Sequence, residues 1–215
     1  MKTIAVTAFK GGAGKSTLTV NLAVCAHLHG LSAIILDLDP QGTSEAWGDL
    51  RELEGPDVVG AKAGNLAKHL KSAEGKEYDL AFIDTPPSET REARLGVRHS
   101  DLVLIPARAD LWDLLAIENT WAMTREERKA AWVVLNGVSP IATGAVADAE
   151  STIAEAGMEL APHRIHNRIA FTYAKTDGRS VVEYEPEGKA AEEIRELFYW
   201  MCKQLDVRVR RRRAS

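Results

Sequence analysis

Eight residues near the N-terminus, Lys10 to Thr17 (KGGAGKST), constrain the fold of this chain more than any other segment. They follow an apolar run from Thr3 to Ala8 that predicts a buried strand, and they lead into a helical pattern from Ser16 to His29. Glycines at such a junction let the backbone wrap around a phosphate chain, with its N–H groups and the positive end of the helix turned inward. The segment therefore predicts a phosphate-binding loop in an α/β fold.

Single residues of this loop have separate expected roles. Lys15 is expected to place its charge on the β- and γ-phosphates of a nucleotide, and the Ser16 hydroxyl is expected to bind Mg²⁺. The general pattern G-x-x-x-x-G-K-[ST] is not strictly met, because Phe9 stands where its first glycine would fall, and a second lysine, Lys10, follows it. Nucleotide contacts are expected from the whole segment: Lys10, Gly11, Gly12, Ala13, Gly14, Lys15, Ser16 and Thr17.

Two later motifs complete a family resemblance. The run LDLDPQG (Leu36 to Gly42) follows one apolar segment, and IDTPP (Ile83 to Pro87) ends another. With the loop, they resemble the K-G-G-x-G-K-[ST]-T, D-x-D-P-Q-G and D-T-P-P motifs of the deviant Walker-A ATPases, the ParA/MinD superfamily. The first expected strand begins at the start of the sequence, so the resemblance is greatest to small ParA-type partition ATPases without an N-terminal DNA-binding domain.

Alternating patterns predict the fold class: an α/β, single-domain P-loop NTPase with a mostly parallel sheet flanked by helices on both faces. The 215 residues are expected to divide into an ATPase domain, 1–207, and a basic, disordered tail, 208–215. Cys25 and Cys202 are expected to be reduced thiols of the core. Strands are expected near residues 2–8, 32–37, 79–84, 101–106 and 130–135, and helices near 15–29, 61–73, 88–98, 112–127, 145–156 and 187–205.

The resemblance also implies roles for three aspartates and for Lys10. Asp84, at the end of its strand, would hold Mg²⁺ through a water, and Asp37 would support either the Mg²⁺ waters or Asp39. Asp39 would orient the attacking water, or else cap a helix ahead of Pro40. Lys10 would cross the interface of an ATP-bound homodimer to reach the partner's phosphates, which makes the dimer depend on the γ-phosphate.

Two further positions have open alternatives. Asn136, at the end of an apolar strand, looks like the family's adenine contact, but Asn136-Gly137 also reads as a turn. The segment Asp110 to Asp113 resembles the loop that reports nucleotide state in the family. Its Trp112 is expected either at the dimer interface or in a core or surface position.

Basic residues late in the chain are the candidate DNA contacts. The family binds non-specific DNA through its last third, which indicates Arg164, Arg168 and Lys189. The C-terminal tail adds Arg210, Arg211, Arg212 and Arg213, which either bind phosphates or are only solvated charges. A membrane-binding helix would need bulky apolar residues, and this tail offers two valines, so no stable membrane association is expected.

The expected function is that of a ParA-type ATPase with ATP and Mg²⁺ as cofactors. It would form an ATP-dependent sandwich dimer, bind non-specific DNA and segregate or position a plasmid, chromosome or other cargo. Hydrolysis would be slow without a ParB-like or other cargo adaptor, and the protein would be cytoplasmic and nucleoid-associated. The alternative is a MinD-like, membrane-associated positioning ATPase.

Overall fold

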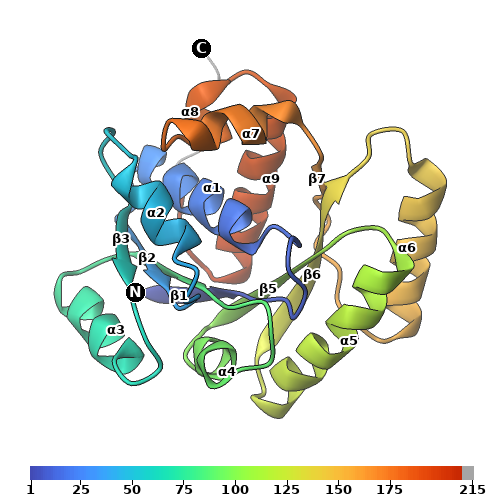
Figure 1. Cartoon of the computed structure of the whole chain (residues 1–215), viewed down its shortest axis with the longest axis horizontal. Coiled ribbons are helices and arrows are strands. Elements are labelled where there is room, and N and C mark those ends of the chain that lie inside the picture. The colour runs from blue at the N-terminus through green and yellow to red at the C-terminus, as the bar shows by residue number, and fades with distance from the viewer. Residues whose placement is uncertain (210–215) are drawn as a thin grey trace.

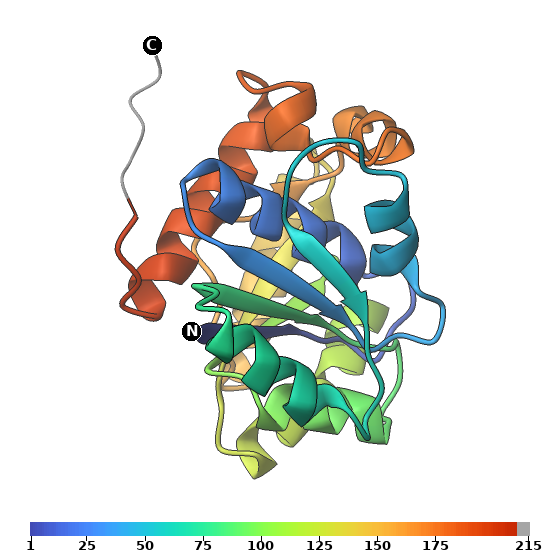
Figure 2. The ribbon, with the colours of Figure 1, turned by 90° about the vertical axis from the view of Figure 1, so that its left-hand side faces the viewer.

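One parallel sheet runs through the protein, with helices on both faces (Figures 1 and 2). The structure is a computed structural model that describes residues 1–209, so Arg210, Arg211, Arg212 and Arg213 lie outside the described residues. The strand order is β3-β2-β4-β1-β5-β6-β7, and every pairing between these strands is parallel. The strands are β1 (Lys2–Val6), β2 (Ala33–Asp37), β3 (Asp57–Gly60), β4 (Leu80–Asp84), β5 (Leu102–Ala107), β6 (Ala130–Val138) and β7 (Ile165–His166).

The helices divide into two layers. Helices α1, α2, α7, α8 and α9 cover one face of the sheet, and α3 to α6 cover the other (Figure 1). Each layer buries its own apolar cluster against the strands, so the expected fold class is confirmed. Their bounds are α1 (Lys15–Leu28), α2 (Thr43–Asp49), α3 (Leu66–Gly75), α4 (Arg91–Arg98), α5 (Leu111–Glu126), α6 (Thr143–Glu155), α7 (Ile169–Thr176), α8 (Val181–Tyr184) and α9 (Lys189–Gln204).

The central strands could be predicted from the sequence because they are continuously apolar. All residues of β2, β4 and β5 are buried, because helices cover the sheet on both sides. The short edge strands β3 and β7 were not expected, nor were α2, α7 and α8. Strand β3 has only four residues, none of them fully buried, and β7 has two, so neither shows a periodic pattern.

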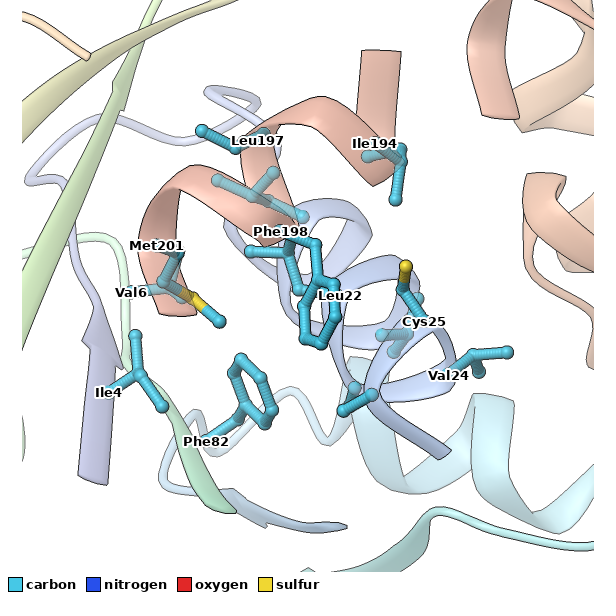
Figure 3. Packing of buried hydrophobic residues seen from close by; sticks show 14 of the residues in the cluster. Ile4, Val6, Leu22, Val24, Cys25, Phe82, Ile194, Leu197, Phe198 and Met201 are labelled. Atoms are coloured by element: carbon cyan, nitrogen blue, oxygen red, sulfur yellow. The ribbon is translucent and has the colours of Figure 1, made fainter. Parts of the chain in front are cut away.

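Helix α1, which follows the phosphate loop, is fixed by the core. Its residue Leu22 packs with Phe82 of β4 and Phe198 of α9, and all three are fully buried (Figure 3). Cys25 and Cys202 belong to the same cluster and are free thiols, as expected. Burial raises the pKa of both, to about 12 for Cys202, so these thiols are unreactive near neutral pH.

This packing predicts the cost of removing one ring. Phe198→Ala should lower the free energy of unfolding by about 3–5 kcal/mol, because it leaves a cavity between α9 and α1. The matched control Tyr173→Ala removes a ring that is 52% exposed and should cost less than about 1 kcal/mol. Urea unfolding followed by circular dichroism measures both, and equal losses would contradict the assignment of Phe198 to the core.

Candidate functional site

The three sequence motifs meet where the central strands end, at the edge of the sheet formed by the carboxyl ends of its parallel strands. Strands β1, β2 and β4 are neighbours, and the register pairs Val6 with Asp84 and Asp84 with Asp37. The phosphate loop leaves β1 at this same edge and enters α1 at Lys15. The motif residues are therefore brought together by parallel pairing, since parallel strands end at the same edge of a sheet.

The loop presents backbone donors to whatever binds there. Gly12 and Gly14 have positive φ angles of 78° and 89°, a region that glycine enters at little cost. Gly14 is the N-cap of α1 and offers no side-chain acceptor, and the first turn of α1 carries no acidic residue. The first N–H groups of α1 thus meet no side-chain cap, which suits an anion at the positive end of the helix dipole.

Lys15 lies inside this loop. Only 6% of the residue is exposed, and its Nζ is 3.5 Å from the carbonyl oxygen of Lys10. Burial lowers the pKa of Lys15, while the charges of Asp84 and Asp39 raise it in part. A cation in this position can neutralise phosphate oxygens that the loop backbone holds.

Asn136, on β6, forms a hydrogen bond with the phosphate loop. Its Nδ2 donates a hydrogen bond of 2.7 Å to the carbonyl oxygen of Ala13. The alternative of an Asn136-Gly137 turn is not what the structure shows, because β6 continues to Val138 with an irregular register between Asn136 and Val138. Contact with adenine stays a prediction for Asn136.

Asp84 is a buried carboxylate with an incomplete set of partners. Its Oδ2 accepts a hydrogen bond of 2.7 Å from the Ser44 hydroxyl. Within residues 1–209 its Oδ1 has no hydrogen-bond partner of normal geometry, although the nearby Ser16 hydroxyl lowers the pKa. Burial dominates and raises the pKa of Asp84 to about 7.

An orphaned carboxylate oxygen beside the Ser16 hydroxyl fits a hard cation. Mg²⁺ prefers oxygen ligands, keeps several waters and uses few carboxylates when phosphates are present. The described residues contain no group of three or more His, Cys, Asp or Glu side chains that could hold a metal ion. Ser16 and Asp84 are therefore the side chains that would hold Mg²⁺, directly or through water.

Asp37 organises the segment that follows β2. Its Oδ1 accepts from the backbone N–H of Asp39 at 3.0 Å, and its Oδ2 accepts from the N–H groups of Ser44 at 2.8 Å and Glu45 at 3.0 Å. Burial raises the pKa of Asp37, and these three donors partly offset the rise. The contact with Asp39 fits the expected support of the Asp39 segment. The other expected role, support of the Mg²⁺ waters, stays a prediction.

Asp39 lines a cavity of about 470 Å³, together with Asp37, Glu45, Lys62 and Glu92. Its Oδ1 accepts a hydrogen bond of 3.0 Å from the N–H of Gln41. The helix-cap alternative does not hold, because α2 begins at Thr43 after the N-cap Gly42. The role of Asp39 in orienting water stays a prediction.

Lys10 points toward the first turn of α5. Its Nζ pairs with the carboxylate of Asp113 and lies 3.9 Å from Asp110 Oδ1. The neighbouring Arg108 donates from Nη2 to the carbonyl oxygen of Gly12 at 3.0 Å. Trp112, between the two aspartates, is 74% exposed, so of its expected positions the core is excluded.

Sequence reasoning missed the contributions of Ser44, Arg108 and Asp113. One signal was available for Asp113, because Asp110 caps α5 and accepts from the Asp113 N–H at 3.0 Å, a typical D-x-x-D helix start. Ser44 and Arg108 carry no such local pattern.

The candidate DNA contacts lie around β7 and the start of α9. Arg164 pairs with Glu150 at 3.3 Å, and Arg168 pairs with Glu193 at 2.6 Å. Lys189, the first residue of α9, is exposed. These three residues stay predictions, and two of them already neutralise a carboxylate of the protein.

The loop geometry predicts a difference between two glycines. Gly14→Ala should abolish most nucleotide binding, because the added Cβ would meet Asn136 Nδ2 at 2.2 Å and the φ of 89° is strained for alanine. The strain alone costs about 1–3 kcal/mol. Gly64→Ala is the control, since Gly64 lies outside the loop and its Cβ meets nothing within 4 Å. Binding of a fluorescent ATP analogue measures both, and equal affinities would refute this loop geometry.

The raised pKa of Asp84 predicts how stability depends on pH. Between the ordinary value of 3.8 and about 7, the folded protein keeps a proton that the unfolded chain has lost. Stability contributed by this group therefore falls as the pH rises through that range. Asp84→Asn has no such proton, so its melting temperature relative to the nucleotide-free parent should be higher at about pH 8 than at about pH 5.

The control for this experiment is Glu74→Gln, which changes an exposed carboxylate of α3. Its melting temperature should follow that of the parent at both pH values. A difference between Asp84→Asn and the parent that does not vary with pH would show that Asp84 is ionised throughout.

Comparisons with known proteins identify relatives of this chain. The chain is 28% identical over 206 residues to the maintenance of carboxysome distribution protein A of Halothiobacillus neapolitanus, covering 91% of this chain and 94% of that protein. It is 27% identical over 157 residues to the chromosome-partitioning ATPase Soj of Thermus thermophilus, covering 60% of this chain and 63% of Soj.

A solved structure shares the fold. The septum site-determining protein MinD of Pyrococcus horikoshii, complexed with Mg-ADP, superposes with a TM-score of 0.75 at 18% identity, covering 95% of this chain and 97% of that one. The sequence model of the CobQ/CobB/MinD/ParA nucleotide binding domain matches residues 4–181. Since this match spans most of the sequence, the chain belongs to the CobQ/CobB/MinD/ParA family, as the three motifs indicated.

Proposed function

We propose that this protein is a ParA-type ATPase that dimerises on ATP, binds non-specific DNA and positions or segregates a cargo. The observation that carries the proposal is the convergence of Lys15, Asp39 and Asp84 at one sheet edge, where both carboxylates act on the charge of Lys15. The half-exposed Lys10 lies at the same edge. The names of two relatives, a carboxysome distribution protein and a chromosome-partitioning ATPase, support a role in positioning or partition.

The residues divide the work of ATP hydrolysis in the proposed mechanism. The loop backbone from Gly11 to Ser16 holds the phosphates, and Lys15 neutralises charge that develops on the γ-phosphate oxygens. Ser16 and Asp84 would hold Mg²⁺, which would supply further neutralisation of the phosphate charge. Asp39 orients the attacking water, and Asp37 keeps the Asp39 segment in place through its backbone contact.

Dimerisation in this proposal depends on Lys10. A lysine that reaches the phosphates of a second subunit contributes binding energy only when those phosphates are present. Its side chain is 39% exposed, so it is accessible to a second subunit at the face where the loop opens. ATP then favours the dimer, and hydrolysis releases it.

The last part of the proposal is the surface that contacts DNA. DNA binding is proposed through Arg164, Arg168 and Lys189, with the arginines of the tail as an addition. Among the helices of residues 1–209, none is long and apolar enough to cross a membrane. Likeness in fold to MinD is the observation that favours the second candidate, a MinD-like ATPase acting on a membrane surface.

One experiment tests the proposal and its alternative. The Asp39→Ala variant should bind ATP but not turn it over, so it should remain in the ATP state. Co-sedimentation with random-sequence duplex DNA and with anionic liposomes, each in Mg-ATP or Mg-ADP, should show pelleting with DNA in ATP alone. Binding should weaken steeply with added salt, as expected for contacts to phosphates.

Two further variants serve as controls. Lys15→Ala should lose nucleotide binding, and Lys10→Ala should keep it while losing the ATP-dependent dimer in light scattering. Pelleting with liposomes instead of DNA would favour the MinD-like candidate. An Asp39→Ala chain that stays monomeric in ATP and pellets with neither would contradict the proposal.

A further inference from the structure

Lys10 is held by its own subunit in this structure. Its Nζ forms an ion pair with Asp113 Oδ1 in the first turn of α5, and it lies 3.9 Å from Asp110 Oδ1. The two sides of the pair differ in burial, because 39% of the Lys10 side chain is exposed but only 3% of the Asp113 side chain. The carboxylate is thus fixed in the protein, and the lysine is the partner that can leave.

The other contacts of Asp113 leave one carboxylate oxygen for Lys10. Asp113 Oδ2 accepts from the N–H of Arg108 at 3.0 Å, and the N–H of Asp113 donates to Asp110 Oδ1 at 3.0 Å. Within residues 1–209, Lys10 is the one cation that forms an ion pair with Asp113. Departure of Lys10 would leave a buried negative charge without a counter-charge, which is unfavourable.

Helix α5 and the segment that precedes it also form two hydrogen bonds with the chain around Lys10. Arg108 Nη2 donates to the carbonyl oxygen of Gly12 at 3.0 Å. The N–H of Phe9 donates to the Thr120 hydroxyl on α5 at 3.2 Å. The chain from Phe9 to Gly12 is therefore bound on both sides of Lys10 by one element, α5 with the segment that precedes it.

We propose that Asp113 is a positioning residue that retains Lys10 in cis and thereby sets how much the dimer depends on ATP. This proposal rests on the proposed function, in which Lys10 acts in trans. A phosphate chain in the second subunit must offer Lys10 a more favourable partner than Asp113 does. Only the more highly charged triphosphate meets this requirement, so the buried carboxylate raises the discrimination between ATP and ADP.

The first test asks whether Asp113 holds Lys10 at all. In the full-length, nucleotide-free protein, the rate at which an amine-reactive ester labels Lys10 is measured by mass spectrometry. Asp113→Asn should raise this rate several-fold, because the asparagine keeps the shape and an acceptor for the Arg108 N–H but loses the charge. Glu118→Gln is the matched control, since it removes an exposed charge from the same helix and should change nothing.

The second test measures the consequence for the dimer. Sedimentation velocity in Mg-ATP should show that the dissociation constant of the Asp113→Asn dimer is roughly fivefold to tenfold lower than that of the parent, the effect of losing one partly buried ion pair. Asp110→Asn should have a smaller effect, because asparagine still caps α5 and the charge lies farther from Lys10. In Mg-ADP, the Asp113→Asn chain should also dimerise at lower concentration than the parent.

The outcomes separate this proposal from the proposed function. Unchanged labelling of Lys10 in a folded Asp113→Asn chain would overturn the retention in cis. A dimer that is equally strong or weaker would overturn its effect on ATP dependence, as would a tighter dimer that persists when Lys10→Ala is added. A parent chain that stays monomeric in Mg-ATP would instead contradict the proposed function, and labelling would still decide whether Asp113 holds Lys10.

Discussion

Two buried carboxylates at the ends of neighbouring strands determine how the rest of the site is built. Asp37 and Asp84 are register partners, 2% and 0% exposed, and burial raises the pKa of both. A charge in such a place must be compensated by hydrogen-bond donors or by a cation. The protein supplies donors to Asp37 and leaves Asp84 short of them.

That difference gives the two aspartates separate tasks. Asp37 accepts hydrogen bonds from the N–H groups of Ser44 and Glu45. These bonds cap the N-terminus of α2, because its N-cap residue Gly42 has no side chain that could cap it. Asp84 keeps one oxygen that has no partner within residues 1–209, and its carboxyl group lies near Ser16, where the phosphate loop enters α1. One carboxylate therefore builds the scaffold of the site, and the other has an oxygen available to a cation.

The contacts of these residues also explain which parts of the fold and of the site could be predicted from the sequence. Strands β1, β2 and β4 carry buried apolar runs, so the parallel sheet and the motifs that contain Lys15, Asp39 and Asp84 could be predicted from the sequence. Helix α2 escaped prediction because a side chain from a different element starts it. Ser44, Arg108 and Asp113 were missed for a related reason, since their partners Asp84, Gly12 and Lys10 lie 40, 96 and 103 residues away in the chain.

In the proposed dimer, the contact between Lys10 and Asp113 gives such a distant pair a role in function. A lysine beside a phosphate loop is attracted by any anion within reach, so without a partner of its own it would bind a second subunit with little regard to the nucleotide. A buried carboxylate in the same subunit gives Lys10 an alternative that must be outcompeted. The strength of that internal pair, compared with the charge gained on a third phosphate, then decides whether dimerisation distinguishes ATP from ADP. Under this proposal, discrimination at the interface is a property of α5 as much as of the phosphate loop.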